Sequence, residues 1–204
     1  MSNVIKRAFD ATLAATGLIL SAPLWAVFAA AIKLEDGGPV FYKQDRVGLG
    51  GRTFEALKFR SMRPDAERTT GAVQAAENDP RVTGIGRLMR ATAMDELPQL
   101  WNILRGDMSF VGPRALRPGE IEQGADGRLT RLEDVPGFAQ RITVRPGLTG
   151  LAQVYAPRDV PPRHKFRYDR IYVKRRSWRL DVQLILVSFW ISVLGTWEAR
   201  GRKY

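Results

Sequence analysis

The sequence contains no cysteine and a single histidine, His164, among its 204 residues. Without cysteine the chain has neither a disulfide framework nor a thiolate metal site, which fits a reducing compartment. One histidine in a basic loop excludes a histidine-rich metal cluster and favours a surface position. The chain also lacks internal repeats and low-complexity tracts, and its length suits one domain with a core of ordinary size.

Acidic residues are scarce, because 21 Asp and Glu stand against 32 Lys and Arg, for a formal charge of +11. A surplus of this size favours an anionic partner, which is a nucleic acid, an anionic lipid or a phosphorylated substrate.

Charge is absent from the 22 residues Ala11–Ile32, a length that crosses a bilayer as a helix. Pro23 interrupts this stretch, and proline bends a helix by removing a backbone hydrogen bond. Basic residues flank the stretch on both sides, whereas a spanning helix keeps its positive flank on one side. These features predict a re-entrant membrane hairpin over residues 1–36, with Ser21 bonded to a carbonyl freed at the bend.

Three alternatives for this segment stay open. A secretory signal would place its cleavage site near Ala29–Ala31, although the apolar stretch is long for one. A single membrane span is the stronger rival, and a buried core helix is disfavoured by the length.

A second uncharged stretch, Val182–Trp197, covers 16 residues and follows a segment with nine Lys or Arg between Arg158 and Arg179. Its tryptophans suit a membrane interface, where indole is half buried and half wet. We expect an interfacial amphipathic helix near residues 180–197 that adheres to anionic lipid headgroups. An ordinary amphipathic core helix is the alternative.

The most informative motif is the adjacent pair Asp95 and Glu96, followed by Pro98. Neighbouring residues point apart inside a regular helix, but they can converge at a helix start, where proline is also tolerated. A helix start attracts phosphate and lowers a carboxylate's pKa. An ionised Asp there is a candidate nucleophile, and a helix cap with a solvated first-turn Glu is the alternative.

Five basic residues are candidates for phosphate binding. Lys58 and Arg60 lie two apart and therefore share one face of a predicted strand. Arg87 and Arg90 shortly precede the carboxylate pair, and Arg114 follows a Gly-Pro turn. Guanidinium groups suit bidentate phosphate contact. Each cation taken alone is equally a solvated surface charge, and the convergence of all five carries the hypothesis.

The pattern of apolar and turn residues predicts a mixed α/β (α+β) catalytic domain over residues 37–204. We expect a hairpin from strands at 40–42 and 53–59, joined by the glycines of 48–51. Further strands are expected at 109–111 and 151–155. Helices are expected at 97–105, ended by Gly106, and at 164–174. Residues 65–78 and 115–138 are expected to be partly helical.

Several motifs in a fixed order make the chain resemble the bacterial sugar transferases, which are monotopic phosphoglycosyl transferases. The resemblance covers nearly the whole chain. Among members of the family, the chain resembles the minimal catalytic form. It rests on Lys6–Asp10, Gly38–Gln44, Lys58–Met62, Asp79–Thr83, Asp95–Leu100, Gly106–Arg114, Arg145–Gly150 and Asp169–Val173.

The resemblance implies transfer of a sugar-1-phosphate from a UDP-sugar to a polyprenyl phosphate, with release of UMP. It implies Asp95 as the nucleophile, Glu96 in metal binding or proton handling, and Mg²⁺ as cofactor. Lys58, Arg90 and Arg114 match basic positions of the family, and Asp169 matches an acidic one. The implied location is the cytoplasmic face of the bacterial inner membrane. Nucleic acid is not an expected partner, and a homo-oligomer stays open.

Two positions depart from the family pattern. Ala115 stands where many relatives have a second proline, and Ala22 separates Ser21 from Pro23, which relatives place side by side. The rival mechanism is direct transfer without a covalent species. The rival from another class is a non-catalytic membrane adaptor that binds anionic lipid or RNA.

Overall fold

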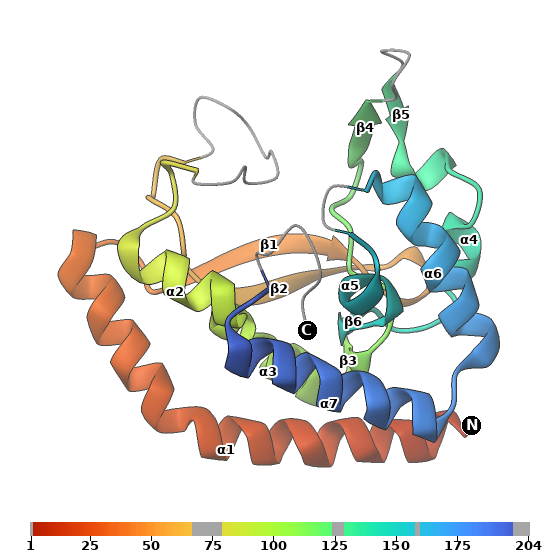
Figure 1. Ribbon diagram of the computed structural model, residues 1–204, viewed down its shortest axis with the longest axis horizontal. Coiled ribbons are helices and arrows are strands. Elements are labelled where there is room, and N and C mark those ends of the chain that lie inside the picture. Colours follow the sequence, from red (N-terminus) through yellow and green to blue (C-terminus); the bar gives the residue numbers. More distant parts are fainter. Residues whose placement is uncertain (1, 67–78, 124–128, 158–159, 198–204) are drawn as a thin grey trace.

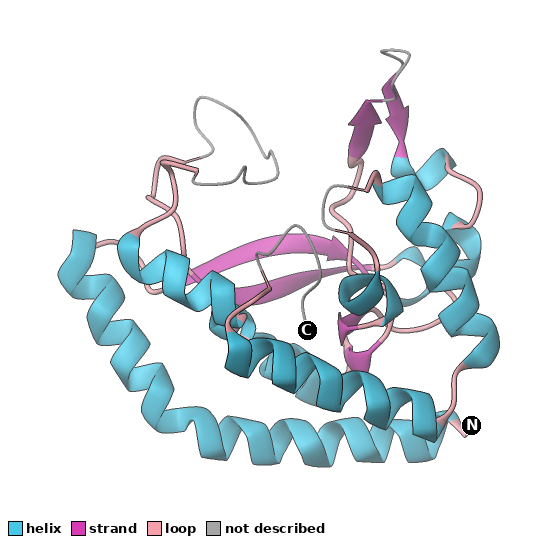
Figure 2. Ribbon diagram, in the orientation of Figure 1, coloured by secondary structure: helices cyan, strands magenta, loops and turns pink. Residues whose placement is uncertain are grey.

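The computed structural model describes residues 2–66, 79–123, 129–157 and 160–197. Figure 2 shows that helices predominate and that the strands pair in short two-stranded sheets. The mixed α/β class expected from the sequence is confirmed, and it includes one long apolar helix at the N-terminus.

The helices are α1 (Asn3–Asp36), α2 (Gly84–Thr92), α3 (Gln99–Arg105), α4 (Phe138–Arg141), α5 (Leu151–Tyr155), α6 (Pro162–Arg175) and α7 (Trp178–Leu194). The strands are β1 (Phe41–Val47), β2 (Thr53–Phe59), β3 (Ser109–Val111), β4 (Ile121–Gln123), β5 (Leu129–Arg131) and β6 (Gly147–Thr149). Short 3₁₀ turns are η1 (Leu49–Gly51), η2 (Met94–Glu96) and η3 (Leu132–Asp134).

The β1–β2 hairpin matches the prediction, although β1 runs further than expected, to Val47. Gly50 and Gly51 take positive φ values of 66° and 81° in the connecting turn, which suits residues without a Cβ. The register pairs Tyr42 with Lys58. Since side chains alternate along a strand, this register decides which side chains share a face with Lys58.

A parallel pair, β3 with β6, lies below α5 and beside α7 in Figure 1. The two backbone segments approach closely here. A Cβ on Gly147 would lie only 2.0 Å from the Gly112 nitrogen, so this position requires glycine. The strand expected at 151–155 is wrong, since those residues form α5 and the strand lies earlier, at Gly147–Thr149.

The segment 115–138, expected to be partly helical, contains the 3₁₀ turn η3 and the first residue of α4, and it also contains the antiparallel pair β4–β5, which was not predicted. Of the segment 65–78, residues 67–78 lie outside the described part of the chain.

Helix α1 is continuous over 34 residues and bends in its middle (Figure 1), where it contains Pro23. Proline removes the bond to the carbonyl four residues earlier, that of Ile19. Ser21 instead donates to the Leu18 carbonyl at 3.5 Å and accepts from Trp25 Nε1 at 3.1 Å. The bend is therefore present, the serine bonds a neighbouring carbonyl, and the re-entrant topology of residues 1–36 stays a prediction.

The first half of α1 packs against α3 through an apolar cluster of Ala14, Leu100, Ile103 and Met108. Near its start, Lys6 pairs with Asp10 at 2.8 Å and with Asp181 of α7 at 3.0 Å. Asp10 also accepts a hydrogen bond from Ser109 at 2.8 Å. Because these charges are buried and paired, they fix α1 against β3 and α7.

Helix α7 is apolar on both sides. Leu184 and Ile191 are buried in the core, while Leu186, Phe189, Trp190 and Val193 are exposed. The helix near residues 180–197 is therefore present, but it lacks the polar outer face of an amphipathic helix. An exposed apolar face of this kind needs a covering partner, and contact with lipid remains our prediction for it.

Candidate active site

Asp95 and Glu96 lie in the single turn η2, between α2 and α3. Helix α2 ends at Thr92 and is capped by Ala93, whose φ of 57° is the one positive value at a non-glycine residue in the described chain. η2 follows at once, and Pro98 precedes the first residue of α3. The predicted position at a helix start is therefore correct to within one turn. Neither carboxylate caps α3, so both are free to face the β1–β2 hairpin.

Three predicted cations surround this pair, each from a different element. Lys58 of β2 forms an ion pair with Glu96. Arg114, in the turn after β3, places Nη1 3.9 Å from Glu96 Oε1. Arg90 in the last turn of α2 lies close enough for its charge to lower the pKa of Asp95. The structure thus brings together residues that are far apart in the sequence.

The two carboxylates differ in acidity. Burial raises the pKa of Asp95 to about 6, and the charge of Glu96 adds to the rise against the opposing charges of Lys58, Arg90 and Arg114. Burial also acts to raise the pKa of Glu96, but Lys58, Arg114 and Arg46 outweigh it and hold that pKa at about 2. Glu96 is therefore ionised throughout the physiological range, and Asp95 takes up a proton at about pH 6.

Arg46 belongs to this site and was missed by sequence reasoning. It shares one face of the hairpin with Tyr42, Gln44 and Lys58, because alternate residues of β1 face the same side and Tyr42 pairs with Lys58. Burial, with help from the charges of Arg114 and Arg117, lowers the Arg46 pKa to about 10. The predicted first strand ended at residue 42, so Arg46 lay outside it, and the face that Arg46 shares with Lys58 follows from the longer β1 and from the observed register.

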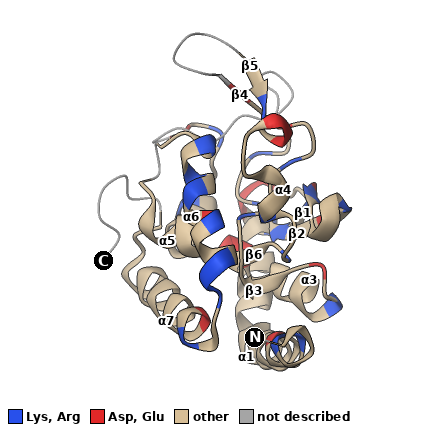
Figure 3. Cartoon of the chain, turned by 90° about the vertical axis from the view of Figure 1, so that its right-hand side faces the viewer, with Lys and Arg blue, Asp and Glu red and all other residues tan. Residues whose placement is uncertain are grey.

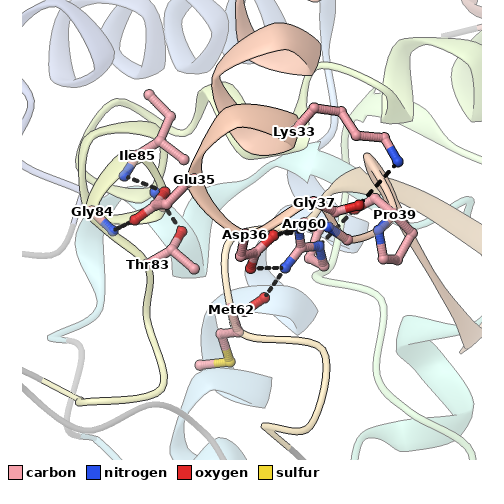
Figure 4. A network of polar contacts seen from close by, with 12 residues as sticks. Lys33, Glu35, Asp36, Gly37, Pro39, Arg60, Met62, Thr83, Gly84 and Ile85 are labelled. Atoms are coloured by element: carbon pink, nitrogen blue, oxygen red, sulfur yellow. Dashed lines mark hydrogen bonds and ion pairs between the residues drawn. The ribbon is translucent and has the colours of Figure 1, made fainter.

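Arg60, which we expected to bind phosphate, is engaged by the end of α1 and the loop after it. Its buried guanidinium donates to the carbonyls of Pro39 at 2.6 Å and Met62 at 3.1 Å. It also pairs with Asp36 through both carboxylate oxygens, one at 2.6 Å (Figure 4). Arg60 follows the last residue of β2, and its contacts fasten the end of α1 to the hairpin.

Helix α2, which carries Arg87 and Arg90, is also held by the end of α1. Glu35 accepts hydrogen bonds from the backbone N–H groups of Gly84 at 2.6 Å and Ile85 at 3.2 Å (Figure 4). Arg87 is exposed, one turn before Arg90, and among the described residues it makes no contact with the carboxylate pair. The structure therefore supports Arg90 as a site residue more directly than Arg87.

Asp169 is buried in α6 and is not in contact with the carboxylate pair. It pairs with the buried Arg141 of α4 at 3.1 Å. Burial raises the pKa of Asp169, and the charge of Arg141 opposes the rise. The predicted helix 164–174 is confirmed as α6, and Asp169 faces inward from it.

The donor set of the site suits Mg²⁺ only in part. Among the described residues there is no group of three carboxylate or histidine side chains. Mg²⁺ is commonly held by one or two carboxylates together with substrate phosphates and water. Glu96 is engaged by Lys58, while Asp95 takes part in no ion pair of the described residues. The pair therefore fits an ion that is held jointly with a phosphorylated substrate.

Comparison with known proteins places this geometry in a family context. The family described as bacterial sugar transferase matches residues 1–195. An exopolysaccharide production protein PSS of Rhizobium leguminosarum bv. phaseoli is 43% identical over 91% of this chain and 93% of its own length.

Two further relatives carry enzyme names. A UDP-glucose:undecaprenyl-phosphate glucose-1-phosphate transferase of Caulobacter vibrioides is 41% identical over 89% of this chain and 67% of its own length. A UDP-N-acetylgalactosamine-undecaprenyl-phosphate N-acetylgalactosaminephosphotransferase of Aeromonas hydrophila is 40% identical over 89% of this chain and 42% of its own length. The sugars in these two names differ, although both names include undecaprenyl phosphate.

Proposed function

The chain belongs to the bacterial sugar transferase family, and we propose that it transfers a sugar-1-phosphate from a UDP-sugar to polyprenyl phosphate, releasing UMP. The observation that carries the proposal is the carboxylate pair in η2, whose two pKa values are shifted in opposite directions and which is surrounded by cations. A phosphorylated substrate needs the cations, and a covalent route needs a carboxylate that is ionised but still basic. The membrane adaptor considered from the sequence leaves this pair without a purpose.

Asp95 is the proposed nucleophile. Its carboxylate oxygen attacks the phosphorus that carries the sugar, and the bond from that phosphorus to the UMP oxygen breaks. UMP leaves with the bonding electrons, and the sugar phosphate stays esterified to Asp95. An oxygen of polyprenyl phosphate then attacks the same phosphorus, and the bond to Asp95 breaks, which restores the carboxylate. Because UMP departs first, one site serves two anionic substrates in turn.

The cations supply the electrostatic part of the proposed reaction. Lys58, Arg90 and Arg114 come from three different parts of the chain, act on the carboxylates and would bind the phosphate oxygens. Arg46, next to Arg114 in the same cluster, would extend this surface toward the second phosphate of the donor. Glu96 holds Lys58 in place, and its charge keeps Asp95 more basic than an ordinary aspartate.

We include Mg²⁺ in the proposal on chemical grounds. Asp95 and Glu96 would hold the ion together with the donor phosphates. When bound there, it would screen the diphosphate charge.

The proposed acceptor is a membrane lipid, which accords with the apolar surface of the protein. In the described chain, α1 is the one helix long and apolar enough to cross a membrane. Its second half and α7 both expose large apolar side chains, among them Leu24, Val27, Phe189 and Trp190. Figure 3 shows Lys and Arg along the neighbouring α6, a charge that suits anionic headgroups. We propose the cytoplasmic face of the bacterial inner membrane, where UDP-sugars are available.

UMP release tests this function. The protein in nanodiscs is given Mg²⁺, undecaprenyl phosphate and a panel of UDP-sugars, with Asp95→Asn in parallel. We expect release with one or two donors, loss of release in the variant, and loss in the parent when a chelator removes Mg²⁺. Full activity of Asp95→Asn would contradict the proposed nucleophile. Undiminished release in the presence of chelator would contradict the proposed ion.

A further inference from the structure

The turn that presents Arg114 is held by its backbone carbonyls, each bonded by a donor from a different part of the chain. The Val111 carbonyl accepts from Tyr172 at 3.0 Å, and the Pro113 carbonyl accepts from the Gly147 N–H at 2.9 Å. The Ala115 carbonyl accepts from Arg46 at 2.9 Å. Gly112 allows the close approach, because a Cβ there would lie 2.3 Å from the Arg145 carbonyl. The turn is therefore fixed on both sides of Arg114.

The carbonyl of Arg114 itself accepts from Nη2 of Arg141 at 2.6 Å. Arg141 is 5% exposed, and its guanidinium lies 4.5 Å from the centre of the Phe166 ring. Its Nε donates to Asp169 at 3.1 Å, and Asp169 is 3% exposed. A buried arginine without a carboxylate partner is costly, so Asp169 is what allows Arg141 to occupy this position.

The side chain of Arg114 needs such support. It is 54% exposed, and Glu96, at 3.9 Å, is its one ion-pair partner among the described residues. A long exposed side chain with a single distant partner is directed mainly by its backbone, because its own rotamers cost little to exchange. The hydrogen bond from Arg141 to the Arg114 carbonyl therefore holds the backbone that directs the Arg114 guanidinium.

We propose that Arg141 and Asp169 form a positioning pair, in which Arg141 clamps the Arg114 carbonyl so that the Arg114 guanidinium faces the Asp95–Glu96 site. This inference rests on the proposed function, because it gives Asp169 and Arg141 a role in that same reaction. Among the described residues, Arg141 pairs with Asp169 and not with either carboxylate of the site. Tyr172, one turn after Asp169 in α6, bonds Val111 of the same segment, so α6 supports the turn at two points.

A double-mutant cycle tests whether Arg141 acts through Arg114. The parent, Arg141→Met, Arg114→Ala and the double variant are compared by kcat/KM for UMP release. Misplacement of a charged group by about 1 Å costs about 100-fold, so we expect a loss of that order in Arg141→Met. The double variant should lose no more than Arg114→Ala alone. Losses that multiply would show that Arg141 acts independently and would overturn the proposal.

Hydrogen exchange gives a second readout that does not depend on activity. We expect the amides of Gly112 and of residues 114–116 to exchange faster in Arg141→Met than in the parent; Pro113 has no amide hydrogen. Arg145→Met is the matched control, because it removes a similar arginine bond from the Gly106 carbonyl, at 2.8 Å, and leaves the turn carbonyls bonded. Unchanged exchange in Arg141→Met, or equal acceleration in both variants, would overturn the positioning role.

Two further outcomes separate the possible failures. If Arg141→Met does not fold, the milder variant Asp169→Asn replaces it, because this substitution exchanges one carboxylate oxygen for an amide nitrogen. Faster exchange of the turn amides between residues 112 and 116 is expected in Asp169→Asn as well. Unchanged exchange in that variant would overturn the proposal. If the parent releases no UMP, the proposed function fails, and the exchange data alone decide whether Arg141 holds the turn.

Discussion

Asp95 and Glu96 are chemically similar neighbours that carry different charges near pH 6, because their surroundings differ. Lys58 pairs closely with Glu96, and together with the more distant charge of Arg114 it keeps Glu96 ionised; Asp95 takes part in no ion pair of the described residues, although the charges of Lys58, Arg90 and Arg114 also lower its pKa. Burial then raises the pKa of Asp95. Two neighbouring carboxylates whose pKa values are pushed apart commonly have separate roles in one site.

The acid limb of the pH–rate profile tests this division. Since Asp95 must be ionised to attack and its pKa is about 6, kcat/KM for UMP release should fall tenfold per pH unit below about pH 6. Lys58→Met should move the limb to higher pH, because Lys58 lowers the pKa of Asp95. Glu96→Gln should move it to lower pH, because Glu96 raises that pKa. A parent limb near pH 4, the ordinary range of aspartate, would contradict the assignment.

The same pKa predicts an effect on stability. A carboxyl group whose pKa is raised in the folded state stabilises the fold while protonated and loses that contribution as the pH rises through about 6. Asp95→Asn should therefore raise the Tm at pH 8, by about 2–4 °C for each 1 kcal/mol gained. At pH 4 the gain should vanish, because Asp95 is then protonated in the folded parent. Thermal unfolding at both pH values measures this, and a lower Tm at pH 8 would contradict the raised pKa.

At the scale of elements, the last turn of α1 organises the approach to the site. Asp36 pairs with Arg60 after β2, and Glu35 bonds the start of α2. The hydrogen bond from Arg60 is the main reason that the pKa of Asp36 is lowered to about 2. One helix end thereby aligns the strand that carries Lys58 with the helix that carries Arg90.

Arg60→Met tests the structural role given to Arg60. It removes the donors to two carbonyls and to Asp36, and unsatisfied groups of this kind cost about 1–3 kcal/mol of unfolding free energy. The KM for the donor should stay unchanged, because Arg60 does not face the site. Lys43→Met is the control, since it removes an exposed ion pair with Glu55 at 2.9 Å and should cost less than about 1 kcal/mol. A large rise in KM with unchanged stability would return Arg60 to the phosphate-binding group.

Elements with local signals could be predicted from the sequence, and elements decided by distant contacts could not. The β1–β2 hairpin has glycines in its turn, and α3 ends at Gly106 with a φ of 96°, so both were predictable. Residues 151–155 are mostly apolar and form a run too short to distinguish a strand from a helix, and packing of α5 on α6 decides for a helix.

The site follows the same rule. The motif around Pro98 identified Asp95 and Glu96, alternation along a predicted strand identified Lys58, and the structure brings these residues together. Arg60 was placed among the phosphate ligands by alternation, which does not reveal its pairing with Asp36, 24 residues earlier. Asp169 has its partner 28 residues away, so its contact with Arg141 had no sequence signal.

At the scale of the whole molecule, a basic surface of net charge +11 is combined with two helices that expose apolar side chains. This combination suits a protein held at an anionic membrane surface. The bend of α1 at Pro23 is the feature that decides between a re-entrant hairpin and a span.

Topology can be measured directly because the chain has no cysteine to interfere. Single cysteines are introduced as Ser2→Cys, before α1, and Arg52→Cys, in the exposed β1–β2 turn. A re-entrant hairpin places both on the cytoplasmic side, so a membrane-impermeant reagent should label both from that side alone in sealed vesicles. Labelling of Ser2→Cys from the opposite side would establish a span.

The covalent sugar phosphate on Asp95 is the central claim, and intact-protein mass spectrometry with peptide mapping tests it most directly. The parent is mixed with the UDP-sugar that supports turnover, without polyprenyl phosphate, next to Asp95→Asn. We predict release of at most one UMP per protein and a mass gain equal to the sugar phosphate less one water. The gain should map to the peptide that contains Asp95 and be absent from the variant. Rapid turnover with acceptor, but no adduct in its absence, would contradict the account and favour direct transfer.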